Sequence, residues 1–228
     1  MFSRASSEPG RLERVFQIGF NRCGTKTLAE FFAAHGYRVA HWESGALAAG
    51  IELARRQGKP LLSHIDRYDV FTDMEKINIS KLHQKRFPNR MLRRLRKVLD
   101  PERDRTPVYA YKYFDELDRQ YPGSRFILNT RDVDGWIASR LRFHRTTPYR
   151  SCIHGDGVHA SEQELGECWR ADWIEHHRRV QEHFKDRPEA LLILDIERDD
   201  PGRLVEFLPN YELKIAHWQR RNTTAPTR

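Results

Sequence analysis

Residues 15–32, with the sequence VFQIGFNRCGTKTLAEFF, constrain the fold of this chain more than any other stretch. Their apolar, β-prone start predicts a strand over Val15–Gly19, and a helical apolar pattern follows over Gly24–His35. Small, polar and basic residues form a short loop between them, Asn21–Thr27. A strand, a tight glycine loop and a helix direct backbone N–H groups and the positive end of the helix dipole at one place, a geometry that binds phosphate. We therefore expect the rest of the chain to complete a site around this loop.

Strand and helix patterns alternate along the remaining sequence. Strands are predicted over Tyr37–His41, Arg125–Thr130 and Leu191–Ile196, with Leu61–Ile65 and Val70–Asp73 as short strands or loops. Helices are predicted over Ser44–Arg56, Asn89–Leu99, Ala110–Gln120, Val133–Arg145, Ser161–Lys185 and Asp200–Phe207. This alternation predicts an α/β fold with a parallel sheet, whose ligands bind at the carboxyl ends of the strands.

Length and composition limit the domain organisation and the cellular location. The 228 residues are enough for one well-buried α/β domain, and no repeat or flexible linker divides them. We expect a flexible leader over 1–14, a single domain over 15–219 and a polar tail over 220–228. The three cysteines, and the lack of a signal-peptide core or an apolar run of bilayer length, predict a cytoplasmic protein without a membrane span.

The net charge of +8 favours an anionic ligand or partner. Most of this excess comes from Lys81–Arg105, which holds ten Lys or Arg residues against three acidic ones. Nucleic acid, an acidic membrane and an anionic sugar acceptor are candidate partners of its helix-like part, Asn89–Lys97, but a solvated helix face is the favoured interpretation. We expect no nucleic-acid partner.

Two segments carry candidate phosphate contacts. Gly19 and Gly24 have the spacing of a P-loop, but the nucleotide-triphosphatase form has Lys directly after the second glycine, and here Lys26 comes one position late. An ordinary strand–helix turn is the other interpretation of this loop. The later segment RFILNTRDVDGWIASRLRFH puts Arg131 just past a strand and Ser139 about two turns into the next helix. Such an Arg and Ser can clamp a second phosphate beside the first loop.

Together these segments resemble the sulfotransferases that use 3′-phosphoadenosine 5′-phosphosulfate (PAPS), and the chain looks like their compact bacterial-type branch. The likeness continues in YPGSRF, HFKDRP and LLILDIERDDPGRLVEFL, so it spans most of Val15–Leu208. It implies a P-loop-like three-layer sandwich, with a central parallel sheet flanked by helices. It also implies that the first loop binds the 5′-phosphosulfate and the second segment the 3′-phosphate. The donor-binding residues carried over are Arg22, Cys23, Gly24, Thr25, Lys26, Thr27, Arg131 and Ser139. The family often has Lys where Arg22 stands, and Thr or Ser where Lys26 stands.

The reaction implied by this resemblance moves a sulfuryl group from PAPS to a hydroxyl or amine of a small-molecule or carbohydrate acceptor. Arg22 and the loop N–H groups would neutralise charge on the leaving phosphate, and no metal is required. The acceptor's proton needs a base. Glu43 is the first candidate, because a Glu after the second strand serves as base in several carbohydrate-acting relatives, and His41 is the second. Glu43 is otherwise explained as a favourable acid at a helix start. The reserve candidates for the base are His64, Asp66 and Asp73. Lys112 has two interpretations: a contact to the sulfuryl donor or to the acceptor, or a solvated lysine on a helix.

Other functions stay open at this point. Leu191–Asp195 resembles a Walker-B strand and favours a P-loop kinase or nucleotide-binding enzyme that uses ATP and Mg²⁺, although the position of Lys26 argues against it. Zinc ligands could be sought among Cys152, His154, His159 and Cys168, but their spacing matches no standard pattern, so no metal is predicted. The sequence leaves the acceptor and the oligomeric state undetermined.

Overall fold

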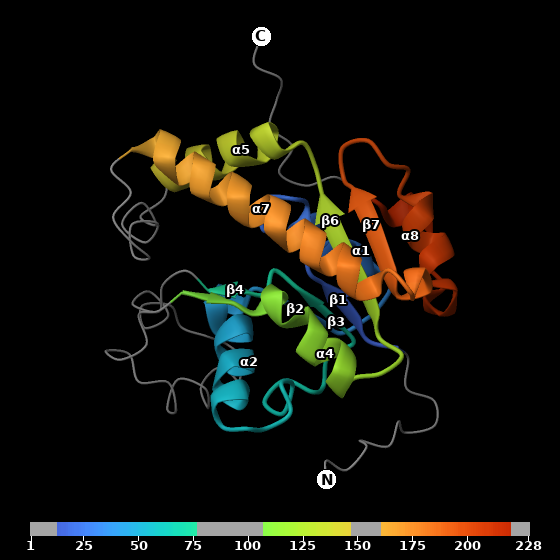
Figure 1. Ribbon diagram of the computed structural model, residues 1–228. Helices are drawn as coiled ribbons and strands as arrows, with labels where there is room; N and C mark the ends of the chain where they lie inside the picture. Colours follow the sequence, from blue (N-terminus) through green and yellow to red (C-terminus); the bar gives the residue numbers. More distant parts are fainter. Residues whose placement is uncertain (1–12, 77–106, 147–160, 220–228) are drawn as a thin grey trace.

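The computed structural model describes residues 13–76, 107–146 and 161–219, which form an α/β fold (Figure 1). Its central sheet has five parallel strands in the order β2-β3-β1-β6-β7. Their bounds are Val15–Gln17 (β1), Val39–His41 (β2), Val70–Thr72 (β3), Arg125–Thr130 (β6) and Leu191–Asp195 (β7). A separate antiparallel ladder joins β4 (Glu75–Lys76) to β5 (Val108–Tyr109).

Helices cover both faces of this sheet, with α7 crossing in front of the strands in Figure 1 and α1 behind them. The α-helices are α1 (Thr25–Ala34), α2 (Ala46–Arg56), α4 (Phe114–Gln120), α5 (Val133–Thr146), α7 (Glu162–Phe184) and α8 (Gly202–Phe207). Short 3₁₀ helices are η1 (Glu43–Gly45), η2 (Ala110–Tyr113), η4 (Pro188–Ala190), η5 (Pro209–Tyr211) and η6 (Ile215–His217). The predicted P-loop-like three-layer sandwich is therefore confirmed.

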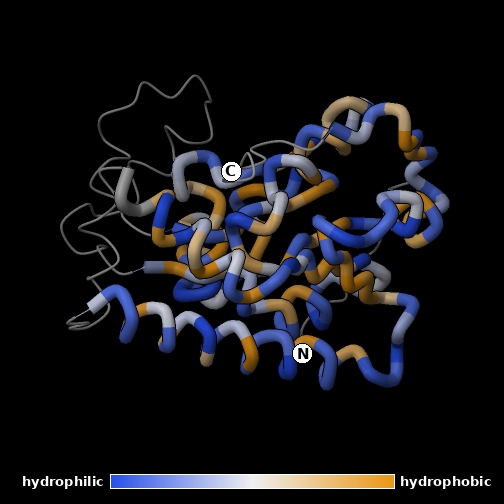
Figure 2. Tube along the Cα trace, turned by 90° about the horizontal axis from the view of Figure 1, so that it is seen from above, coloured by the Kyte–Doolittle hydropathy of each residue, from blue (hydrophilic) through white to orange (hydrophobic). Residues whose placement is uncertain are grey.

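Alternation along the strands divides the core into two layers, because successive side chains point to opposite faces of a sheet. Phe16, Phe71 and Phe126 pack on one face with residues of α2, α4, α5 and α7. On the other face, neighbouring strand residues such as Val15 and Ile127 pack with residues of α1 and α8. In Figure 2 most hydrophobic segments lie inside the molecule and most hydrophilic ones lie outside.

Most predicted elements appear with boundaries shifted by a few residues. Ser161 and Glu164 form a capping box at the start of α7, in which each side chain bonds the other residue's backbone N–H at 3.2 and 3.0 Å. Leu61–Ile65 forms a run of turns and not a strand. Its apolar side chains are buried, and the N–H groups of Leu61 and Leu62 donate to the side chains of Gln120 and Tyr121 instead of to a neighbouring strand. The predicted leader, apart from residues 13–14, the polar tail and the helix Asn89–Leu99 lie outside the described residues.

The order of the strands locates the site. The chain leaves β1 through α1 toward β2 and β3, whereas β6 lies on the other side of β1 and leads to β7. The carboxyl ends of β1 and β6 are thus the topological switch point, which is where open α/β sheets bind ligands. No helix among the described residues is long and apolar enough to cross a membrane.

Candidate functional site

The loop between β1 and α1 is held by a buried amide network. Asn129 of β6 accepts a hydrogen bond from Gly19 N at 3.1 Å and donates one to the Cys23 carbonyl at 2.7 Å. Gln17 donates to Asn129 Oδ1 at 2.5 Å, and its own Oε1 accepts from the backbone N–H of Asp73 at 2.7 Å. One network therefore fixes the loop, the end of β6 and the residue that follows β3.

Two glycines are required by the path of this loop. A Cβ on Gly19 would lie 2.2 Å from the Asn129 backbone oxygen, so no larger residue fits there without displacing β6 or the loop. Gly24 has φ 76° and stands immediately before α1, in the left-handed region that glycine adopts without strain. The chain turns sharply at Gly24 into the helix.

The N-terminus of α1 is open to an anion. Its first N–H groups have no partners within the helix, no side chain caps them, and its first turn contains no acidic residue. Thr25 and Thr27 in this turn are both buried. These N–H groups and the helix dipole together favour negative charge at the loop.

Arg22 and Arg131 bring two positive charges to the same place. Arg131 donates to the Arg22 carbonyl at 3.3 Å, and Arg22 Nε lies 3.4 Å from Ser139 Oγ on α5. Burial and the nearby charge of Arg131 lower the pKa of Arg22. Arg131 also pairs with Glu197, but its buried Nε has no partner among the described residues. The predicted residues Arg22, Arg131 and Ser139 therefore lie together, and an anion between the two guanidinium groups would relieve their repulsion.

Asp73 lies on the other side of the loop. Its side chain hydrogen-bonds Thr25, the first residue of α1, and its φ is 54°. Burial, followed by the charge of Glu75, raises the pKa of Asp73 to about 7, although Arg140, Thr25 and Arg22 oppose this rise. A reserve candidate in the sequence thus contacts the loop directly.

A buried ion pair supports this side of the site. Glu75 and Arg140 are 2.9 Å apart, and their side chains are only 2% and 6% exposed. The Arg140 guanidinium lies over the rings of Trp136 and Trp169, at 5.3 and 4.7 Å from their centroids. The pair joins the segment after β3 to α5, which also carries Ser139.

Glu43 and His41 lie at the edge strand β2, one strand farther from the loop than Asp73. Trp42, Glu43 and Ser44 all have positive φ, between 50° and 59°, so the chain makes a left-handed turn here that costs free energy in non-glycine residues. Burial raises the pKa of Glu43, and the one opposing charge among the described residues is Arg67 rather than a residue of the loop. Burial and then the charge of Lys26 lower the pKa of His41 to about 4, so its ring is neutral at pH 7.

Two other predicted donor-site residues do not turn their side chains to the loop. The Lys26 side chain is 51% exposed and pairs with Glu30 one turn along α1 at 3.6 Å. Cys23 is completely buried, burial raises the pKa of its thiol, and its carbonyl accepts the hydrogen bond from Asn129, so its side chain is not available to a ligand. Lys112 pairs with Asp172 of α7 at 2.5 Å.

Asp195 at the end of β7 does not behave as a free Walker-B carboxylate. Its Oδ1 accepts hydrogen bonds from the backbone N–H groups of Glu197 and Arg198 at 2.9 and 3.2 Å, which caps the turn after the strand. Within the described ranges, no group of three or more His, Cys, Asp or Glu residues is arranged to hold a metal ion. Cys152, His154 and His159 lie outside them.

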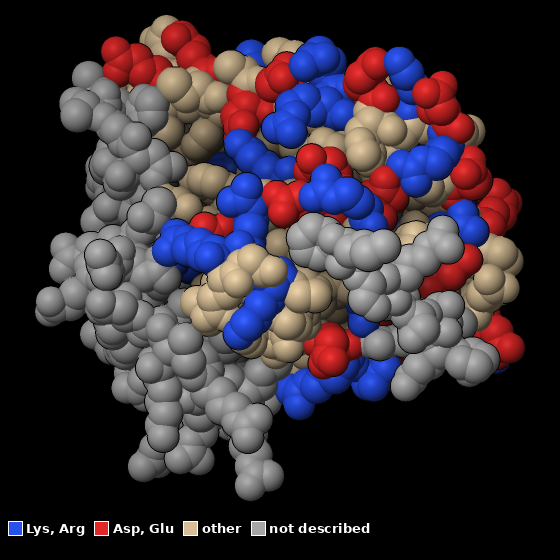
Figure 3. All heavy atoms as spheres, turned by 60° about the horizontal axis from the view of Figure 1, so that its bottom comes forward, with Lys and Arg blue, Asp and Glu red and all other residues tan. Residues whose placement is uncertain are grey.

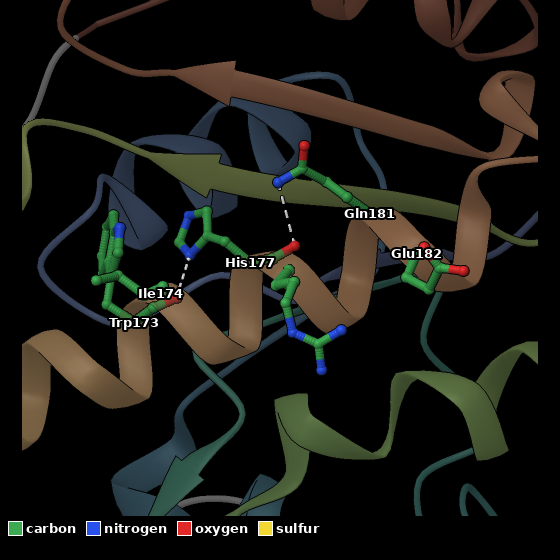
Figure 4. Close-up of a pocket in the computed structure, with 6 residues that line it drawn as sticks. Trp173, Ile174, His177, Gln181 and Glu182 are labelled. Carbon is green, nitrogen blue, oxygen red and sulfur yellow. Dashed lines mark hydrogen bonds between the residues drawn. The ribbon is translucent and has the colours of Figure 1, made fainter.

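One face of the molecule carries both signs of charge (Figure 3). On the face shown in Figure 3, Lys and Arg side chains are interspersed with Asp and Glu. An open groove of about 540 Å³ runs along α7, and all of its lining residues among those described belong to α7 (Figure 4). Two of its lining residues contact the core of the site: His177 Nε2 lies 3.1 Å from Thr130 Oγ1 at the end of β6, and the Trp173 ring stacks on Phe20 in the loop after β1.

Sequence reasoning missed Asn129 and Gln17. Each is a polar residue inside an apolar strand, in RFILNT and VFQIGF, and both are completely buried. A buried amide must satisfy its hydrogen bonds within the protein, so a lone Asn or Gln in such a strand indicates a structural network. That signal was present beside the loop.

Comparison with known families adds an independent finding. A family model described as "Sulfotransferase domain" matches residues 14–154, more than half of the 228 residues. No curated protein matches the chain significantly.

Proposed function

Because the chain belongs to the sulfotransferase family, we propose that it transfers a sulfuryl group from PAPS to a hydroxyl or amine of a small-molecule or carbohydrate acceptor. One observation carries the choice of donor: Arg22 and Arg131 lie beside the uncapped N-terminus of α1. Two guanidinium groups and a helix start suit a ligand with more than one phosphate-type group. The few cysteines of the sequence support a cytoplasmic location.

In this proposal, two separate parts of the site bind the 5′-phosphosulfate and the 3′-phosphate of the donor. The N–H groups of Gly24–Thr27 and the Arg22 guanidinium bind the 5′-phosphosulfate and neutralise the charge that develops on the leaving phosphate. Arg131, with its unused Nε–H, and Ser139 bind the 3′-phosphate. Lys26 contributes through its backbone, because its side chain pairs with Glu30.

Binding of the product nucleotide, 3′-phosphoadenosine 5′-phosphate (PAP), tests the donor site without knowledge of the acceptor. We expect PAP to raise the thermal unfolding temperature, and ATP with Mg²⁺ or RNA to have little effect. Arg131→Ala should weaken PAP binding about 10- to 100-fold in calorimetric titration, because it removes charge-assisted hydrogen bonds.

Arg178→Ala is the matched control. Arg178 is exposed on α7, pairs with Glu175 at 2.8 Å and lines the α7 groove, so its loss should leave PAP affinity unchanged. Tight binding of ATP and Mg²⁺ without binding of PAP would replace this proposal with the kinase alternative. Weakened PAP binding by Arg178→Ala alone would move the donor site to the groove.

A further inference from the structure

Asp73 is fixed in position by the same network that holds the loop. It directly follows β3, the neighbour of β1, and its backbone N–H donates to Gln17 Oε1 at 2.7 Å. Its φ of 54° is a left-handed conformation, which Asp tolerates better than most residues. The backbone that carries the Asp73 carboxylate is therefore fixed by a hydrogen bond.

This carboxylate lies beside the anion-binding end of α1. It hydrogen-bonds Thr25 and interacts electrostatically with Arg22, and both residues belong to the part of the site assigned to the 5′-phosphosulfate. Asp73 follows β3, whereas Arg131 follows β6, on the opposite side of β1. The acid thus approaches the loop from the side that the proposed nucleotide contacts leave open.

A carboxylate in this place needs a physical explanation, because it repels the anion that the loop attracts. Contact with Thr25 alone does not explain it, since an uncharged amide would make the same contact without repulsion. Glu75 and Arg140 face Asp73 from β4 and α5, and Arg22 faces it from the loop. With burial, they leave Asp73 with a pKa of about 7, the range in which a group both takes up and releases a proton at neutral pH.

We infer that Asp73 is the catalytic base that removes the proton from the acceptor hydroxyl, an inference that rests on the proposed function. The acceptor oxygen forms a bond to sulfur as its proton passes to the Asp73 carboxylate. The bond between sulfur and the bridging oxygen of the donor breaks, and its electron pair stays on that oxygen, which becomes part of the 5′-phosphate of PAP. Asp73 then releases its proton to water.

The assignment gives Asp73 the role that the sequence predicts for Glu43. Glu43 lies after the edge strand β2, and the charge that lowers its pKa is that of Arg67 rather than of a residue in the loop. Asp73 follows the strand next to β1 and contacts α1 itself. A base must come within hydrogen-bonding reach of the proton that it abstracts, so the nearer carboxylate is favoured.

Asp73→Asn tests this role, because the amide keeps the size of the side chain and an oxygen for Thr25 but accepts no proton. Turnover is measured as PAP formed from PAPS, with water, a hexose, a phenol and an aliphatic alcohol as acceptors. We expect kcat to fall about 10²- to 10⁴-fold, and PAP affinity to stay within about threefold. The acid limb of the wild-type pH–rate profile, with a midpoint near 7, should disappear in the variant.

Asp69→Asn is the matched control at the amino end of β3, where Asp69 pairs with Arg38 at 2.6 Å, and it should leave kcat unchanged. Glu43→Gln is the competing variant. Loss of turnover in Glu43→Gln with turnover retained in Asp73→Asn would overturn the inference, as would an unchanged acid limb in Asp73→Asn. Failure of the wild-type chain to bind PAP would instead refute the proposed function, so the two failures are distinguishable.

Discussion

Asp73→Asn should also change how stability depends on pH, whatever the protein catalyses. The pKa of Asp73 rises from its ordinary value of 3.8 to about 7 in the folded chain, through burial and then the charge of Glu75. The folded state therefore holds this proton more tightly than the unfolded state does. The protonated Asp73 carboxyl gives the folded state its full stability below about pH 4, and this stability is lost as the pH rises through 7.

The magnitude follows from the size of the shift. About three pH units, at about 1.4 kcal/mol each, correspond to a cost on the order of 4 kcal/mol for the ionised carboxylate above pH 7. Asparagine carries no charge and keeps an acceptor for Thr25, so the variant avoids this cost. At pH 8 we expect it to unfold on the order of 10 °C above the wild-type chain, and at pH 4 the two should coincide.

Thermal unfolding followed by circular dichroism between pH 4 and 8, without ligand, measures this difference. Asp118→Asn is a control of opposite sign. Burial alone raises the pKa of Asp118, but hydrogen bonds from Arg187 and His183 outweigh it and lower the pKa below its ordinary value of 3.8. The ionised carboxylate therefore stabilises the fold at every pH above about 4, so this variant should be less stable than the wild-type chain across the whole range from about pH 4 to 8. A melting difference for Asp73→Asn that is independent of pH, or a variant less stable than wild type at pH 8, would refute the electrostatic reasoning.

Three further variants test the supports of the site. Gly19→Ala should cost about 1–3 kcal/mol and abolish PAP binding in titration, because its Cβ would lie 2.2 Å from the Asn129 backbone oxygen; native PAP affinity would show that the loop adapts. Asn129→Leu leaves the Gly19 N–H and the Cys23 carbonyl unpaired, at about 1–3 kcal/mol each in denaturant titration, and an unchanged midpoint would contradict the network. Glu75→Leu leaves the buried Arg140 charge without its partner and should lower the free energy of unfolding by about 3–5 kcal/mol. Adding Arg140→Leu should restore most of this loss, and equal losses in the single and double variants would argue against the pair.

The sequence predicts the framework of the site because the framework is local. The strand over Arg125–Thr130 appears with the predicted bounds, since its apolar run is continuous and Gly123 marks the turn before it. The positions of Arg131 and Ser139 beside the loop follow from the same short-range reasoning about strand ends. These features need only neighbouring residues and the topology of a parallel sheet.

The features that the sequence does not reveal depend on distant residues or on rare backbone conformations. The environment of Asp73 is set by Arg140, which lies in a later helix and meets Glu75 only in the folded chain. The left-handed turn at Trp42–Ser44 has no sequence signature, because the non-glycine residues in it rarely adopt positive φ. The antiparallel ladder β4–β5 is too short for a periodic pattern, with two residues in each strand.

The amide network around Asn129 divides the loop into two classes of amide hydrogen. The Gly19 N–H is bonded to Asn129 Oδ1 in the interior, so it should exchange with deuterium only when the core opens, as slowly as a central strand. The N–H groups in the first turn of α1 have no helical partners and should exchange quickly until an anion binds them. Hydrogen exchange would therefore report ligand binding at Thr25–Thr27 while Gly19, a few residues away, stays unchanged.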